Sequence, residues 1–211
     1  MLPTILPLYG SIVLGVDDSW ILSLFMATAL ISAMFFVVIW LFVVKRFGAK
    51  TAFTLAIILY IIVLIPFMFI SDMFFGFIAF FFLGIGLAGA MIVRDVTMGA
   101  IIDEDELKIG TRREAGYYGI NGFVVKLTNV FVFISIAIVF NAVDMQVFDP
   151  SSITGASVLG LRLLMVVFPA VVLGVGLIAI LRFPITKEKY QEITDDARKL
   201  HEQKKAKIGD T

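Results

Sequence analysis

The chain alternates between long apolar segments and short polar ones. Four apolar segments carry no charge, namely 20–44, 51–71, 73–93 and 163–181, and a fifth, 115–143, carries a single charged residue, Lys126. About 20 consecutive apolar residues are enough to cross the hydrocarbon core of a bilayer as a helix. The pattern therefore predicts five complete transmembrane helices, one of which contains a lysine.

The first segment, 1–16, is also uncharged but is shorter. As a helix it would reach about 24 Å, which is less than the roughly 30 Å of the hydrocarbon core. It has no basic residue near its start, contains Pro3 and Pro7, and runs into two aspartates without a typical cleavage site. These features argue against a signal peptide, and we expect an incomplete sixth transmembrane helix here.

Successive loops carry charges of opposite sign. The basic set comprises Lys45, Arg46, Lys50, Lys108, Arg112 and Arg113, together with the lysines and arginine of the tail; the acidic set comprises Asp17, Asp18, Asp72, Asp144 and Asp149. Basic loops normally lie on the cytoplasmic side of a membrane. We therefore expect both termini in the cytoplasm, and the polar stretch 141–155 to form the longest outer loop.

These patterns predict an all-α membrane protein with two parts. Residues 1–185 would form a six-helix transmembrane bundle with a truncated first span, and residues 186–211 a charged cytoplasmic tail. The tail alternates acids and bases, which is typical of a solvated helix with i,i+4 ion pairs; a role at the membrane surface or in regulation is the alternative. We expect the chain to be integral to the plasma membrane, surrounded by the lipid bilayer.

Composition narrows the functional classes. The chain is 60% hydrophobic and 16% charged, whereas about a quarter of a soluble domain is charged. Its 17 basic and 17 acidic residues give no net field to attract nucleic acid. The absence of cysteine and the single histidine, His201, exclude disulfides and multi-histidine metal sites. No nucleophile, base and acid converge in the sequence, so we expect neither an enzyme nor a cofactor or metal site.

Lys126 is the residue that most clearly suggests function. An ammonium group inside a membrane span is costly and normally faces a cavity, a counter-ion or a substrate path. Gly119 and Gly122 precede it on nearly the same helical face and would leave room beside it, while Asn121 and Asn129 add polar groups within one or two turns. The alternative is a lysine that extends to the interface, but Lys126 lies about 16 Å into the predicted helix, which is deep for that.

A glycine motif at 84–89 has the spacing G-x-G-x-x-G. A dinucleotide-binding fingerprint requires a preceding strand, whereas this motif lies inside an apolar span. Small residues there allow neighbouring helices to approach closely. We interpret the motif as a packing seam.

Charged residues near the helix ends have more than one interpretation. Arg94 and Asp95 point about 100° apart on a helix, so each is available to bind another helix, either as part of a gate or pathway or as an interfacial anchor. Arg162 fits an anchor that extends to the outer interface. The four acids at 103–106 lack the spacing of a calcium loop, and we expect a solvated loop neutralised by Lys108, Arg112 and Arg113.

Several stretches resemble one transporter family, the glycoside–pentoside–hexuronide:cation symporters, which form the melibiose-permease branch of the major facilitator superfamily. They are DEDELKIGTRREAGYYG at 103–119, FVVKL at 123–127, GLR at 160–162, Pro169, RFPIT at 182–186, and KRFGAK at 45–50. The first two are similar to the loop and eleventh helix of that family. The six spans would then correspond to helices seven to twelve of a twelve-helix transporter.

The resemblance implies roles for particular residues. Lys126 matches a lysine near the sugar and cation sites, and Asn121 and Gly122 match positions that line the sugar cavity, with Asn129 nearby. The residues expected to close a cytoplasmic gate are Arg94, Asp95, Asp103, Arg112 and Arg113. The chain departs from the family at Ala100, where members often have an acidic residue, and the family's cation-binding acids lie in its first six helices.

Facilitator-type transporters bind substrate between two bundles that rock about a site near the membrane midplane. The resemblance therefore implies a partner: a separately encoded N-terminal bundle, a second copy of this chain, or an upstream stretch outside the reading frame. We predict the C-terminal half of a symporter for a sugar, glycoside or similar small solute, coupled to Na⁺ or H⁺. Two alternatives remain open, a lysolipid or other amphiphile transporter of the same branch and a non-transporting membrane scaffold or accessory subunit.

Overall fold

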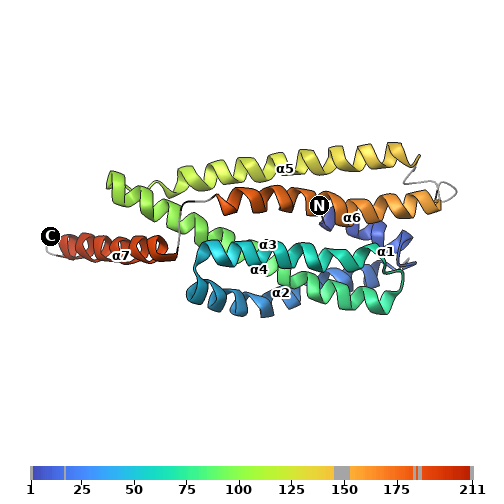
Figure 1. Cartoon of the computed structure of the whole chain (residues 1–211), viewed down its shortest axis with the longest axis horizontal. Coiled ribbons are helices and arrows are strands. Elements are labelled where there is room, and N and C mark those ends of the chain that lie inside the picture. The colour runs from blue at the N-terminus through green and yellow to red at the C-terminus, as the bar shows by residue number, and fades with distance from the viewer. Residues whose placement is uncertain (1, 17, 145–152, 183, 185–186, 210–211) are drawn as a thin grey trace.

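The structure is a computed structural model that describes residues 2–16, 18–144, 153–182, 184 and 187–209. All regular elements in these residues are helical (Figure 1). They are α1 (Leu2–Ile12), α2 (Ser19–Phe47), α3 (Ala49–Leu64), the 3₁₀ helix η1 (Ile65–Met68), α4 (Met73–Ile109), α5 (Glu114–Ala142), α6 (Gly155–Leu181) and α7 (Lys187–Gly209). The all-α prediction is confirmed.

The membrane-spanning pattern agrees with the sequence. Within the described residues, five helical segments are long and apolar enough to cross a membrane: α2, α3 with η1, α4, α5 and α6. The remaining predicted span is α1, whose 11 residues are too few. Part of the expected outer loop, 145–152, lies outside the described residues.

The two ends of the bundle differ in the turns that they carry. We call the end with the α2–α3 and α4–α5 turns the inner end, because its basic residues predict a cytoplasmic location. At the outer end, the carboxylates of Asp18 and Asp72 accept hydrogen bonds from the first free amides of α2 and α4. At the inner end, Gly48 and Gly110 have positive φ of 85° and 81°, which lets the chain turn sharply between helices.

α4 is longer than the sequence suggested. The acids at 103–106 were expected in a loop, but α4 continues through them to Ile109, and that prediction is wrong. Its 37 residues correspond to about 55 Å, so the helix projects well past the uncharged stretch 73–93. Local sequence supports the continuation, because Glu104 and Lys108 form an i,i+4 ion pair of 3.0 Å that stabilises the helix.

The glycine motif in α4 is a packing seam, as expected. A Cβ atom added to Gly84 would overlap Ser32 of α2, and one on Gly86 would overlap Tyr60 of α3. One on Gly89 would lie 2.8 Å from a ring atom of Trp40 on α2. The Trp40 indole also donates a hydrogen bond of 2.9 Å to the backbone carbonyl one residue after Gly84. These contacts place α2, α3 and α4 in one tightly packed layer.

Polar contacts close the outer end of the bundle. The hydroxyl of Tyr9 on α1 donates to the carbonyl of Phe67 at 2.6 Å. Arg162 of α6, which was expected to anchor α6 at the outer interface, donates from Nη2 to Ser71 Oγ at 2.6 Å and to the carbonyl of Ile70 at 3.3 Å. Arg162 therefore ties α6 to the segment that precedes α4.

α5 and α7 are the least enclosed elements. In Figure 1, α5 runs beside α6 along one side of the bundle, and α7 projects beyond the inner end. Only 11% of the apolar window of α5 is buried, compared with 50% for α4. The side chains of α5 are therefore available to contact something outside this chain.

Candidate functional site

Lys126 lies on an exposed and sterically open face of α5. Gly122, Lys126 and Asn129 fall within about 60° of one another around the helix axis, since each residue advances by about 100°. Lys126 and Asn129 are exposed. A Cβ atom added to Gly119 or Gly122 would meet nothing within 4 Å. The structure thus provides the open space beside the lysine that the glycines predicted.

Asn121 does not share this face. Five residues separate it from Lys126, which corresponds to about 140° around the helix, and Asn121 is half-buried where Lys126 is exposed. Of the four residues expected along a substrate path, the structure therefore groups Gly122, Lys126 and Asn129 and places Asn121 apart. We call the group that contains Gly119, Gly122, Lys126 and Asn129 the lysine face.

A cavity of about 680 Å³ lies between α3, α4, α5 and α6. Its lining residues are Tyr60, Leu64, Leu87, Thr128, Phe131, Val132, Ser135, Phe168, Pro169, Val172 and Leu173. The hydroxyls of Thr128 and Ser135 donate to carbonyls of their own helix at 3.0 and 2.7 Å. Thr128 is about 160° around α5 from Lys126. The cavity is consequently an apolar space on the side of α5 away from the lysine face.

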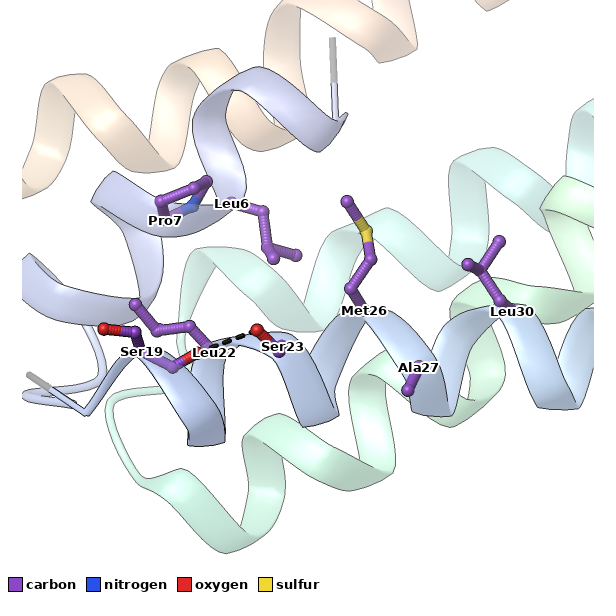
Figure 2. Close-up of a pocket in the computed structure, with 8 residues that line it drawn as sticks. All are labelled: Leu6, Pro7, Ser19, Leu22, Ser23, Met26, Ala27 and Leu30. Atoms are coloured by element: carbon purple, nitrogen blue, oxygen red, sulfur yellow. Dashed lines mark hydrogen bonds between the residues drawn. The ribbon is translucent and has the colours of Figure 1, made fainter.

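A second cavity, of about 520 Å³, lies between α1 and α2. Figure 2 shows Leu6 and Pro7 of α1 facing Leu22 and Met26 of α2 across it. The hydroxyl of Ser23 donates to a backbone carbonyl one turn earlier at 2.8 Å, within α2 itself. This cavity therefore also presents mainly carbon, and it contains none of the predicted site residues.

Arg94 and Asp95 bind each other. Arg94 Nε and Nη2 both lie 3.0 Å from Asp95 Oδ1, and the two side chains are 44% and 52% exposed. From the sequence, we expected each residue to be free to bind a group on another helix. In the structure, the two neighbours on α4 form an ion pair with each other. Their pairing separates them from the other residues of the expected gate.

The remaining expected gate residues belong to a cluster of ion pairs at the inner end. Arg112 Nη1 lies 2.7 Å from Asp103 Oδ1 and 3.0 Å from Glu106 Oε2. Arg112 Nε lies 3.1 Å from Glu114 Oε2. Arg113 makes two bonds to Asp105, of 3.0 and 3.1 Å. The two arginines therefore fix the turn between α4 and α5.

Residues of α7 complete this cluster. His201 Nε2 lies 2.9 Å from Glu106 Oε2, and Lys204 Nζ lies 2.6 Å from Glu106 Oε1. Lys189 Nζ lies 2.8 Å from Glu104 Oε1. We call Glu104, Glu106 and these three residues of α7 the tail cluster. The side chain of Glu106 is only 3% exposed, so α7 helps to bury it.

The sequence of the chain matches a known protein family. A model of the family described as MFS/sugar transport protein matches residues 1–187. The chain belongs to the MFS/sugar transport protein family. No curated protein matches the sequence.

Membership in the MFS/sugar transport protein family fits the geometry described above. The match covers α1 to α6 and ends at Lys187, the first residue of α7. The chain is thus an integral membrane bundle of the major facilitator type. The lysine face and the cavity of about 680 Å³ lie within the matched segment, whereas the basic residues of the tail cluster lie beyond it.

Electrostatics at the tail cluster favour the charged state of its acids. These acids follow the uncharged stretch 73–93 and lie in the inner extension of α4. Hydrogen bonds from Lys204 and then His201 lower the pKa of Glu106 to about 2, against a smaller opposing effect of burial. Hydrogen bonds from Lys189 and Lys108 lower the pKa of Glu104. Both carboxyl groups are therefore charged at neutral pH.

The sequence missed the tail cluster. Local bases were expected to neutralise the acids at 103–106, and Lys108, Arg112 and Arg113 do so. The bases of α7 were not expected there. One signal in the sequence was the spacing of Ile193, Ala197 and Leu200, which places an apolar stripe on an otherwise charged helix.

Proposed function

We propose that this chain is one helical bundle of a cation-coupled secondary transporter for a sugar, a glycoside or a similar small solute, and that a second bundle completes the substrate cavity. The observation that carries the proposal is the exposure of Lys126 in the middle of α5. The resemblance of residues 103–127 to the melibiose-permease branch supports the choice of solute and of cation coupling.

A second bundle would relieve an energetic cost at Lys126. A lysine at the centre of a bilayer costs about 2.5–3.5 kcal/mol or more when it faces lipid. Within the described residues, Lys126 has no ion-pair or hydrogen-bond partner. A water-filled cavity between two bundles would remove this cost, because the ammonium group would then be solvated. The second bundle would be an N-terminal bundle or another copy of this chain.

Each residue of the lysine face has a role in this proposal. Lys126 contributes positive charge and modulates the binding of cation and solute. Asn129 donates and accepts hydrogen bonds with solute hydroxyls, and Gly122 leaves room for the solute. Asn121, on a different side of α5, would contact solute only if it lies at the edge of the cavity.

The inner side of the cavity would be closed by charged residues. Arg94 and Asp95 would act there as a pair, because they bind each other on α4. Arg112 and Arg113 would hold the α4–α5 turn through their bonds to Asp103 and Asp105. These contacts would have to rearrange or move as a unit when the inner side opens.

Uptake into proteoliposomes tests the proposal. The complex purified from membranes would be reconstituted and supplied with a panel of radiolabelled sugars and glycosides under an imposed Na⁺ or H⁺ gradient. We expect gradient-driven uptake that falls at least about tenfold in Lys126→Ala, in line with the loss of a charged interaction. Lys45→Ala, which removes a lysine from the inner end of α2, should leave uptake unchanged. Equal uptake by the two variants would contradict the role of Lys126, and no uptake of any solute would favour a membrane scaffold.

A second candidate solute is an amphiphile such as a lysolipid. The observation in its favour is the apolar cavity of about 680 Å³, lined by Phe131 and Phe168 among others. An acyl chain would fit such a lining, because the hydroxyls of Thr128 and Ser135 already bond within α5. Competition separates the two candidates: excess free sugar should inhibit uptake by a sugar transporter, and excess lysolipid should inhibit uptake by an amphiphile transporter.

A further inference from the structure

We propose that α7 is a releasable strap, which holds the inner end of α4 against the α2–α3 turn when it is docked and frees that end when it detaches. This inference concerns a part of the chain that the proposed transport function does not use. The family match ends where α7 begins, so the strap is an addition to the matched bundle.

The first observation is the apolar stripe of α7. Ile193 and Ala197, one turn apart, are 5% and 3% exposed. On the side of α4, Ile102 is 1% exposed. A solvated helix would leave Ile193 and Ala197 in water, whereas α7 packs against α4 and α3 and buries both side chains. α7 is therefore docked by a specific face, in contrast to the solvated tail that alternating charges suggested.

The second observation is charge complementarity. The last turns of α4 carry four consecutive acids at 103–106, and three basic side chains of α7 reach two of them. Lys204 also donates to the carbonyl of Gly110 at 3.2 Å, which satisfies a free backbone acceptor at the end of α4. The docked position of α7 is thus specified by both the acidic segment and the turn that follows it.

The third observation is the span of the contact. Near its first residue α7 lies against the α2–α3 turn, since a Cβ atom added to Gly48 would be 3.0 Å from Lys187 Cβ. Nearly five turns later, Lys204 reaches Glu106 and Gly110 at the α4–α5 turn. α7 therefore bridges the two turns of the inner end (Figure 1).

The fourth observation shows why the strap can be released. Lys189, His201 and Lys204 are each about two-fifths exposed, at 42%, 41% and 42%. Because these basic side chains reach water, salt can screen their ion pairs with the acids of α4. The apolar contact adds only a small aliphatic stripe. Docking thus depends on a few salt-sensitive ion pairs, two of which share one buried carboxylate, Glu106.

Distance measurement between spin labels tests the strap directly. The chain contains no cysteine, so labels can be placed specifically at Thr51→Cys on α3 and Gln203→Cys on α7, both of which are exposed positions. Pulsed electron–electron double resonance on the full chain in nanodiscs would then give the distribution of distances. We expect one narrow population in the parent protein at low salt. In about 1 M KCl, where charges are screened beyond about 3 Å, we expect a second, broader population.

Three matched variants separate ionic docking from docking by the apolar stripe alone. Glu106→Gln and Lys204→Gln should each raise the ratio of undocked to docked protein by about tenfold, because each removes a charge-assisted hydrogen bond. Lys199→Gln should not change it, since Lys199 pairs with Asp196 inside α7. Lys204→Gln leaves the bundle itself untouched, so it remains informative if Glu106→Gln disturbs α4.

Three outcomes would overturn the proposal. The first is a broad distribution in the parent protein at low salt, which would mean that α7 is not docked. The second is a ratio in both Glu106→Gln and Lys204→Gln equal to that in Lys199→Gln. The third is a docked population that neither salt nor these variants reduce, which would mean a permanent attachment. None of these readouts depends on transport, so failure of the strap and failure of the proposed transport function are distinguishable.

Discussion

Lys204 Nζ and Glu106 Oε1 lie 2.6 Å apart, although 98 positions separate the two residues in the chain. The lysine belongs to α7 and the glutamate to the inner extension of α4. Because the glutamate side chain is only 3% exposed, its charge requires partners in the folded protein. The contact therefore links the last helix of the chain to the bundle that the family match covers.

Acidification should release α7 only at low pH. A carboxyl whose pKa is lowered on docking contributes fully above its usual value of 4.5, and its contribution is lost as the pH falls through the lowered value of about 2. We therefore expect Glu106 to hold α7 at pH 5 to 7 and to lose its hold between about pH 4.5 and 2. The label distances at Thr51 and Gln203 measure this change. The same titration of Glu106→Gln should lack the transition that Glu106 contributes.

Lys126 should contribute nothing to the stability of the isolated bundle. It has no partner within the described residues, so we expect Lys126→Leu to change the free energy of unfolding by no more than about 0.5 kcal/mol in detergent. Thermal unfolding monitored by circular dichroism is the measurement. A large loss of stability would mean that the ammonium group is bound inside this bundle, which would contradict its assignment to a cavity outside it.

The lysine face should be accessible to water in the assembled protein. We expect a spin label at Asn129→Cys to be relaxed by a water-soluble paramagnetic reagent. A label at Val171→Cys, in place of a 60% exposed side chain of α6, should be relaxed by oxygen dissolved in the lipid. The same response at both positions would mean that Asn129 faces lipid, and the proposed cavity between two bundles would then be wrong.

Gly84→Ala should destabilise the bundle. The added Cβ would overlap Ser32 and lie 2.6 Å from the backbone nitrogen of Ala33, and overpacking of this kind costs about 1–3 kcal/mol. Gly174→Ala is the matched control on α6, because a Cβ there meets nothing within 4 Å. We expect the control to leave stability unchanged or to raise it by up to about 1 kcal/mol. Thermal unfolding of both variants in the same detergent compares them.

The sequence predicted the number and position of the spans because hydropathy is a local property. The stretch 73–93, for example, lies wholly within α4. It did not predict that α4 continues to Ile109, since charged residues suggest a loop, although Glu, Leu and Lys are good helix formers. The place of Lys126 near the middle of α5 could also be predicted, because it depends only on where the apolar stretch begins and ends.

Other features depend on tertiary packing and could not be predicted from local patterns. The half-burial of Asn121, away from the lysine face, follows from how α5 is rotated within the bundle. The pairing of Arg94 with Asp95 depends on the rotamers that their surroundings allow. The contact between Lys204 and Glu106 joins segments far apart in the chain, and an alternation of charges on the tail does not specify which distant acids it will meet.

The length of α4 connects the inner end of the bundle to its outer end through a single helix. The helix runs unbroken from its cap at Asp72 to Gly110, contains no proline, and is longer than the membrane core by nearly half its own length. A tilt about the glycine seam near its middle would move its two tips in opposite directions. Movement of the inner tip on release of α7 would then be accompanied by movement of the outer end of α4, because no proline interrupts the helix between them.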